Sequence, residues 1–368
     1  MGIRLLVIGL LTAFISCVKV QYTMAQEKTA VFSKPKLSGY AIGQYQYNGQ
    51  HEAKSNTFNL RMVRLSLDGR ILNDFVYKLQ GQVNGNTSTL GESPRIVDVY
   101  IEWQKYDWLH VKAGQFKRPF TFENPMNPID QGFMGYSQNV SKLAGFNDRV
   151  GEHASNGRDI GIQIQGDLLP ISIGRSLVHY QIGVFNGQGI NTKDVDNQKD
   201  IIGGLWLMPV KGLRIAWFGW TGSYARKGTD GIKSIAKRRY AISGEYKGED
   251  WIFRSEYIHS TGSAFCTVYN QSADNKETDI DDAAGNRADG FYALVIAPVI
   301  KNKFHAKVRY DLYRPRAEWG SSKTFYEIGV DYILTNNLKI NVEYAFVNDR
   351  SLAISNYSMI DTQMSFRF

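Results

Sequence analysis

The chain has 368 residues, of which 43% are hydrophobic, 13% aromatic and 21% charged, and its formal net charge at pH 7 is +8. Its mean hydropathy is slightly negative, at -0.32, which excludes a bundle of apolar transmembrane helices. This length suits one large all-β domain as well as two ordinary domains. The 21 Tyr, 19 Phe and 35 Gly favour a β protein with many turns.

The first 25 residues have the features of a secretory signal peptide. Arg4 supplies the positive start, residues 5–16 the apolar core, and Thr23-Met24-Ala25 a small-residue cleavage site. The apolar run of about a dozen residues is shorter than the ~20 that a membrane-spanning helix needs. Lipoprotein processing at Cys17 is the alternative, although Phe14 stands where an aliphatic residue is usual.

Cleavage would lower the formal charge from +8 to +6, because Arg4 and Lys19 are lost. Of the two cysteines, only Cys266 would remain, so the fold cannot depend on an internal disulfide.

Beyond this segment, apolar and polar residues alternate over stretches of about ten residues, the pattern of an outer-membrane β-strand. Turn residues bound each stretch. We therefore predict an even number of strands, as single-chain bacterial barrels require. The sixteen predicted strands are 37–47, 58–71, 75–84, 96–104, 109–116, 159–168, 178–186, 201–208, 213–221, 240–247, 251–260, 290–297, 303–313, 324–334, 338–347 and 359–368.

The connections between these strands alternate between short and long. Tight turns are predicted at 72–74, 105–107, 209–212, 248–250 and 335–337, and longer loops at 187–200, 222–239, 261–289 and 348–358. Barrels of the outer membrane have this asymmetry of periplasmic turns and external loops. Residues 119–157 are then the third external loop, and a loop of this length within a compact fold is usually functional. We expect it to fold inward and narrow the pore.

Residue parity assigns the two faces of each strand. Val63, Leu65 and Leu67 lie on one face of the second predicted strand, and Arg64 and Ser66 on the other. A ring of about sixteen strands is too wide for side chains to fill, so the polar row should face a watery lumen and the apolar row the lipid. Aromatic residues near strand ends suit the two membrane interfaces, and they are Tyr47, Trp103, Trp108, Trp206, Trp217, Trp251 and Tyr332.

The last predicted strand ends in Phe368. An alternating strand with a terminal aromatic residue resembles the signal that outer-membrane barrels present to the barrel assembly machinery. The predicted division of the chain is thus a signal peptide at 1–25, a short periplasmic segment at 26–36 and a transmembrane β-barrel at 37–368.

Several segments resemble the phosphate-selective porin O and P family. They are FNLRMVRLSLDG at 58–69 with YKLQ at 77–80, VDVYI at 97–101, VKAGQFKRPF at 111–120 and RDIGIQ at 158–163. The resemblance implies an outer-membrane porin of a Gram-negative bacterium: a homotrimer of 16-stranded antiparallel barrels, each with an inward-folded third loop. It also implies passive diffusion of small hydrophilic solutes, with anion selectivity that depends on arginines along the lumen and lysines at the constriction.

Candidate pore residues follow from parity and position. Strand parity places Arg64, Arg70, Lys78, Lys112 and Arg309 in the lumen. Lys117, Arg118 and Arg158 flank the third loop, where side chains that line the narrowest section would set selectivity. In the alternative reading, Lys117 and Arg118 pair with carboxylates such as Glu123 or Asp130 and only hold the loop. Acidic residues share the lumen faces, so a preference for anions such as phosphate is expected to be modest.

No catalytic, cofactor or metal site is predicted. The six histidines lack HExxH and GxSxG contexts. The acidic run Asp274, Glu277, Asp279, Asp281 and Asp282 departs from the calcium-loop spacing, which favours a solvated loop or one that bridges lipopolysaccharide through divalent ions. Basic residues are spread along the strands, which does not indicate nucleic-acid binding. Two alternatives to a porin stay open: a structural or adhesive barrel with a plugged lumen, and a barrel hydrolase.

Overall fold

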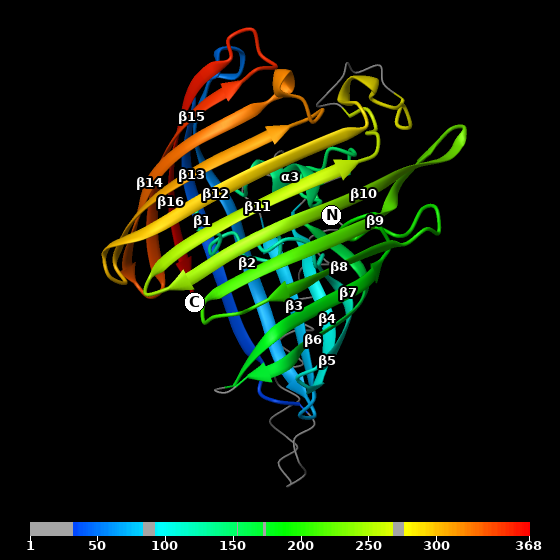
Figure 1. Cartoon of the computed structure of the whole chain (residues 1–368), viewed down its shortest axis with the longest axis vertical. Helices are drawn as coiled ribbons and strands as arrows, with labels where there is room; N and C mark the ends of the chain where they lie inside the picture. The colour runs from blue at the N-terminus through cyan, green and yellow to red at the C-terminus, as the bar shows by residue number, and fades with distance from the viewer. Residues whose placement is uncertain (1–31, 84–92, 153, 172–173, 268–275) are drawn as a thin grey trace, which may run out of the picture.

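The computed structural model describes residues 32–83, 93–152, 154–171, 174–267 and 276–368 (Figure 1). The predicted signal peptide, its cleavage site and Cys17 lie outside these residues, as does Asp274. No helix in the described part of the chain is long and apolar enough to cross a membrane.

Sixteen strands form one closed antiparallel barrel. Each strand pairs with the next along the chain, and β1 closes the ring by pairing with β16. The strands are β1 (Lys36–Asn48), β2 (Ser55–Ile71), β3 (Phe75–Val83), β4 (Arg95–Tyr106), β5 (Leu109–Lys117), β6 (Arg158–Ile171), β7 (Arg175–Phe185), β8 (Asp200–Leu207), β9 (Leu213–Gly228), β10 (Gly231–Gly248), β11 (Trp251–Thr261), β12 (Arg287–Ile300), β13 (Phe304–Arg314), β14 (Lys323–Thr335), β15 (Leu338–Asp349) and β16 (Asn356–Arg367). All sixteen predicted strands are confirmed, and turns and loops alternate as expected.

One predicted loop is wrong. Residues 222–239 were expected as an external loop, but β9 and β10 stay paired through this segment as far as Gly228 and Gly231, where the hairpin turns. The hairpin projects beyond the barrel in Figure 1. A strand that rises out of the bilayer no longer needs alternating lipid-facing residues. Its charged sequence therefore resembles a loop, while its ladder hydrogen bonds keep it a strand.

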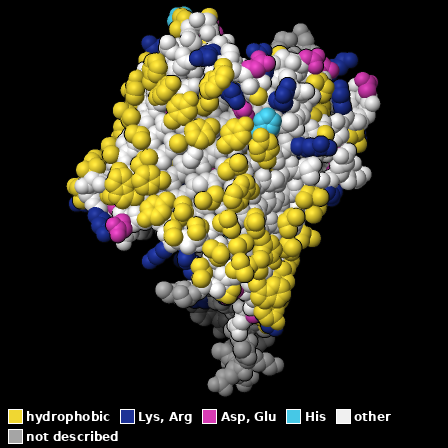
Figure 2. Space-filling model, viewed as in Figure 1, with side chains coloured by type: hydrophobic (Ala, Val, Ile, Leu, Met, Phe, Trp, Pro, Cys, Tyr) yellow, Lys and Arg dark blue, Asp and Glu magenta, His cyan; other side chains and the backbone are white. Residues whose placement is uncertain are grey.

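The outward face carries the apolar row. Tyr326, Ile328 and Val308 are 51%, 58% and 50% exposed, although each lies in mid-strand. Figure 2 shows such side chains spread over the front face of the barrel. Exposed apolar surface of this extent marks a surface that is covered in the native environment, and in a closed barrel that cover is lipid.

The inward face is polar on β2 and β3, where Arg64, Ser66, Gln80 and Gln82 are buried. The expectation of a wholly watery lumen is wrong on the opposite wall. Inward positions of β8–β12 form one buried apolar cluster that includes Ile202, Phe218, Trp220, Ile258, Tyr292, Leu294 and Ile296. Trp206, predicted at the membrane interface, also faces this cluster and packs 5.1 Å from Phe122.

The ends of the barrel lie close together at the β1–β16 seam. Phe368 donates its backbone N–H to the Gly39 carbonyl at 3.1 Å and accepts from the Gly39 N–H at 3.0 Å. Ahead of β1, Phe32 bridges Ile71 at the turn end of β2. Phe32, where the described residues begin, and the carboxyl-terminal Phe368 are therefore both held by backbone pairing at the periplasmic rim.

Replacing a lipid-facing residue with a charge tests the assignment of faces. Ile328→Arg places a guanidinium near the middle of β14 and should destabilise the barrel by about 2–4 kcal/mol, the cost of an arginine at the bilayer midplane. Urea unfolding in lipid vesicles measures the change. Ile354→Arg is the control, since Ile354 is equally exposed, at 54% against 58% for Ile328, but lies in an external loop. Equal stability of the two variants would contradict the assignment.

Candidate functional site

The third loop, residues 118–157, turns into the lumen at the end of β5 and covers the apolar wall. Phe120 packs 5.4 Å from Trp220, and Phe122 packs 5.7 Å from Phe218. The loop's one short helix, α3 (Gln138–Leu143), contacts β11, β12 and β13 and lies inside the barrel in Figure 1. The loop is thus bound to one side of the lumen.

Glu256 of β11 holds the start of the loop. Its carboxylate accepts hydrogen bonds from the backbone N–H of Phe122 at 2.7 Å and of Glu123 at 2.9 Å. It also accepts from the Tyr292 hydroxyl at 2.7 Å and from the Ser243 hydroxyl. Glu256 is fully buried, and these four donors offset the cost of removing its carboxyl group from water.

Further charged residues of the wall bond the loop backbone. Glu343 accepts from the Met134 N–H at 3.0 Å, and Asp311 accepts from the Gln138 N–H at 2.9 Å. Arg309 donates to the Gly135 carbonyl at 2.9 Å and forms an ion pair with Glu327. These side chains satisfy backbone groups that a loop in a lumen would otherwise leave unpaired.

Close packing of α3 requires a glycine on the wall. A Cβ added to Gly290 of β12 would lie 2.5 Å from the Asn139 Cβ, well inside van der Waals contact. Asn139 donates to the Glu256 carbonyl at 3.0 Å from this position. Gly290 therefore sets how closely the helix approaches the sheet.

The end of the loop is held by a buried ion-pair network. Arg118 bonds Glu152 at 2.7 Å and Asp159 at 2.9 Å, and all three side chains are at most 1% exposed. Two carboxylates thus share one guanidinium. Burial raises the pKa of Glu152 to about 7, although the Arg118 charge acts in the opposite direction. Beside it, burial would raise the pKa of Asp148, but Arg239, 2.6 Å away, holds that pKa below its usual value.

Lys117 closes the loop on itself. Its ammonium donates to the carbonyls of Asn124 and Met126 at 2.7 and 2.5 Å and to the Tyr136 hydroxyl at 2.8 Å. The structure therefore gives Lys117 and Arg118 contacts that fix the loop. This is the loop-holding role of the alternative reading, although their partners are not the Glu123 and Asp130 that it named.

A gap of about 230 Å³ remains between the loop and β2. On the barrel side it is lined by Arg61, Met62 and Arg64; on the loop side it is lined by Pro128, Gly135, Tyr136, Ser141, Phe146, Asn147, Ala154 and Asn156. Among these described residues there is no carboxylate. The charge that faces the gap is therefore positive.

A row of polar side chains crosses the barrel wall at this level. Strand register places Tyr40, Arg64, Gln82 and Arg95 side by side on β1 to β4. Arg64 donates to Gln82 at 2.7 Å and to the Tyr40 hydroxyl at 2.9 Å. Arg95 donates one N–H to the Ala154 carbonyl at 3.0 Å, while its Nε and Nη2 have no partner among the described residues.

The remaining predicted residues lie away from the gap or are neutralised. Arg158 forms an ion pair with Asp98 at 2.6 Å next to the gap. Lys78 pairs with Asp68 at 3.0 Å and Lys112 with Glu102 at 3.3 Å, both nearer the periplasmic turns. Arg70 is exposed at such a turn, where it bonds the Asn73 carbonyl.

Sequence reasoning missed Arg61. By alternation it should point to the lipid, because it is three residues from the inward Arg64. The pairing of β1 with β2 skips Arg61 between Met62 and Leu60, and this β-bulge turns its side chain inward. There it donates to the Met134 carbonyl and to Gln363. Only the register of two strands reveals this.

Comparison with solved structures supports the same architecture. An anion-selective porin from Comamonas acidovorans has a TM-score of 0.64 at 12% identity, covering 92% of this chain and 100% of that one. OmpF of Salmonella typhi, solved with daunomycin, has a TM-score of 0.65 at 11% identity, covering 91% and 98%. The trimer form of OmpT from Vibrio cholerae has a TM-score of 0.57 at 11% identity, covering 91% and 99%. A search of curated proteins gave no match.

The closed barrel with an inward-bound loop has the fold of these outer-membrane porins. Residues 38–169, from β1 to β6, match the family described as phosphate-selective porin O and P. This match confirms the predicted resemblance, and the protein is placed in the outer membrane of a Gram-negative bacterium.

A conservative change of Glu256 tests its role in the loop. Glu256→Gln keeps the shape but replaces one acceptor oxygen by an amide NH₂ that faces donors, at a cost of about 1.5–3 kcal/mol for each charge-assisted hydrogen bond that is lost. We expect faster proteolysis within residues 118–157 and a larger pore conductance. Glu52→Gln, an exposed residue of the first external loop, is the matched control. Unchanged proteolysis and conductance would contradict the anchoring role.

The raised pKa of Glu152 predicts a pH dependence. The folded loop binds a proton more tightly than a free glutamate with a pKa of 4.5. Its contribution to loop packing is thus fully present below about pH 4.5 and is lost as pH rises through about 7. Hydrogen exchange of the loop amides, corrected for intrinsic rates, should rise between pH 5 and 8 by a factor on the order of a hundred. Glu152→Gln should abolish this rise; an equal rise in the variant would refute it.

Proposed function

We propose that the protein is a general porin through which small hydrophilic solutes diffuse passively, with a preference for anions such as phosphate. The passage runs between the third loop and the wall formed by β1 to β4. Solutes that cross there meet guanidinium and hydroxyl groups that can replace part of an anion's hydration shell.

The observation that carries this proposal is the charge of the gap. Arg61 and Arg64 line it, Arg95 lies in the same row with N–H groups left unpaired among the described residues, and no described lining residue is acidic. Local positive charge in a low-dielectric passage raises the concentration of anions and lowers that of cations.

A plugged structural barrel is the second candidate, because the loop fills so much of the lumen. Arg64 is only 1% exposed, so the passage is narrow in this conformation. The porin is favoured because Arg61 and Arg64 face the gap and no described residue that lines it carries a carboxylate to neutralise them. The fold and the family match fit a channel rather than a hydrolase.

We also propose that the protein functions as a homotrimer. OmpT of Vibrio cholerae, which shares the fold, was solved as a trimer. Each barrel is closed by its own β1–β16 pairing, so each chain would keep a separate passage.

Ion selectivity tests the anion preference. In planar bilayers under a salt gradient, the reversal potential of the wild type should have the sign of an anion-selective pore. Arg61→Gln with Arg64→Gln removes two positive charges from the gap and should move the reversal potential toward zero. Arg70→Gln and Lys54→Gln remove two exposed charges away from it and should leave the potential unchanged.

Comparing the conductance for phosphate with that for chloride at equal ionic strength tests the preference for phosphate. The wild type should conduct phosphate at least comparably to chloride, and the Arg61 and Arg64 variant should lose phosphate conduction more than chloride conduction. A cation-selective wild type, or a reversal potential that the Arg61 and Arg64 variant leaves unchanged, would contradict the proposal.

A further inference from the structure

The outer surface of the barrel carries a second group of cations, unrelated to the pore. In Figure 2, basic and acidic side chains gather at the upper margin of the apolar face. Strand register places Arg238 of β10, Thr261 of β11 and Arg287 of β12 side by side at this margin. Arg238 and Arg287 are exposed, and neither side chain has a carboxylate partner among the described residues.

The row immediately below is aromatic. Tyr240 is 50% exposed and stacks on His259 at 5.2 Å. Next in the row, Asp289 is neutralised by Arg314, with contacts of 2.7 and 2.5 Å. Below these residues the surface is apolar, with Ile242 and Tyr246 at 47% and 38% exposed. The order from the loops downward is therefore arginine, aromatic ring and aliphatic surface.

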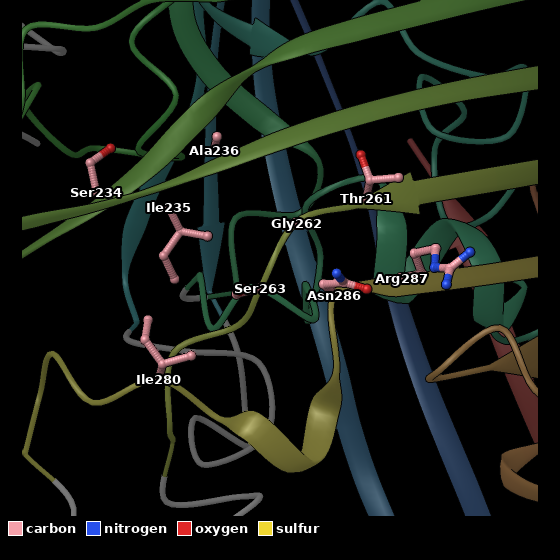
Figure 3. Close-up of a pocket in the computed structure, with 9 residues that line it drawn as sticks. All are labelled: Ser234, Ile235, Ala236, Thr261, Gly262, Ser263, Ile280, Asn286 and Arg287. Atoms are coloured by element: carbon pink, nitrogen blue, oxygen red, sulfur yellow. The ribbon is translucent and has the colours of Figure 1, made fainter.

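A pocket of about 470 Å³ lies directly above the arginines (Figure 3). It forms where β10 extends beyond the ends of β11 and β12. Ser234, Ile235 and Ala236 of β10 lie on one side of it, and Thr261, Asn286 and Arg287 on the other. Its lining combines the hydroxyl and amide groups of Thr261, Ser263 and Asn286 with the apolar side chains of Ile235 and Ile280, and Arg287 lies at its edge.

We propose that this pocket, with Arg238 and Arg287, binds the phosphorylated sugar headgroup of a glycolipid of the outer leaflet. One guanidinium group can bind two oxygens of the same phosphate. The two arginines are two strands apart, roughly 10 Å across the sheet. The Thr261 hydroxyl and the Asn286 amide group, which line the pocket, match sugar hydroxyls. The acyl chains would lie against Tyr240 and Ile242.

Position and charge together favour this occupant over a soluble one. The arginines face outward at the border between the apolar belt and the external loops, the level at which a membrane lipid carries its headgroup. Free phosphate would gain nothing from the apolar surface below. An acidic protein partner would need a surface that extends above the bilayer, whereas this one continues down into the lipid-facing wall.

Binding of purified full-length protein to lipid A tests the proposal, with native mass spectrometry of detergent complexes as the readout and chelator present throughout. Wild-type protein should bind bisphosphorylated lipid A in preference to its dephosphorylated form. Arg238→Gln with Arg287→Gln should weaken binding roughly tenfold, since each charge-assisted contact is among the stronger hydrogen bonds. Lys54→Gln with Lys193→Gln, exposed on other external loops, removes the same charge and should bind as the wild type.

Several outcomes would overturn the inference. One is equal lipid A affinity of the arginine variant and the wild type, and another is equal binding of lipid A and its dephosphorylated form. A third is the absence of wild-type binding in the presence of chelator, which would indicate a bridging cation instead of direct arginine contacts. Inorganic phosphate at millimolar concentration should not displace the lipid. All the changed side chains are exposed, so unchanged thermal unfolding of both variants confirms that they fold. None of these results depends on ion conduction, so the proposed pore function is tested separately.

Discussion

The structure depends on one constraint: a loop of forty residues folded into a barrel must have its backbone polar groups paired there. The wall supplies the partners as charged side chains. Glu256, Glu343 and Asp311 accept from loop N–H groups, and Arg309 and Lys307 donate to loop carbonyls. Apolar contacts with β8–β12 add the hydrophobic contribution. Many charged residues of the lumen therefore hold the third loop in place, whether or not they also influence ion selectivity.

This constraint divides the cations of the lumen into two groups. Arg118, Arg239 and Arg309 each meet a buried carboxylate and hold the loop. Removing one partner of such a pair is costly, because the other charge stays buried without compensation. Arg61, Arg64 and Arg95 meet hydroxyl, amide and carbonyl groups instead. Of these, Arg61 and Arg64 line the gap, and their positive charge is the physical basis for proposing anion preference.

The alternation of apolar and polar residues was sufficient to predict the barrel, because a strand in lipid must repeat every second residue. The alternation failed as a guide for residues that do not face lipid. The β9–β10 hairpin rises out of the bilayer, so Lys233 and Arg238 gave a loop-like pattern. Trp206 was misplaced because an inward aromatic residue is ordinary once a loop covers it. The inward turn of Arg61 arises from a β-bulge, which depends on the pairing of two strands and not on either sequence alone.

The most direct test of the account is whether ions cross beside the third loop. Ser141 of α3 lines the gap, whereas Cys266 is buried in an external loop. In planar bilayers, the Ser141→Cys variant should give discrete current steps that a bulky thiol reagent reduces, while the reagent leaves wild-type steps unchanged. Absence of current from folded protein, or variant current that the reagent does not alter, would contradict a passage between the loop and β2.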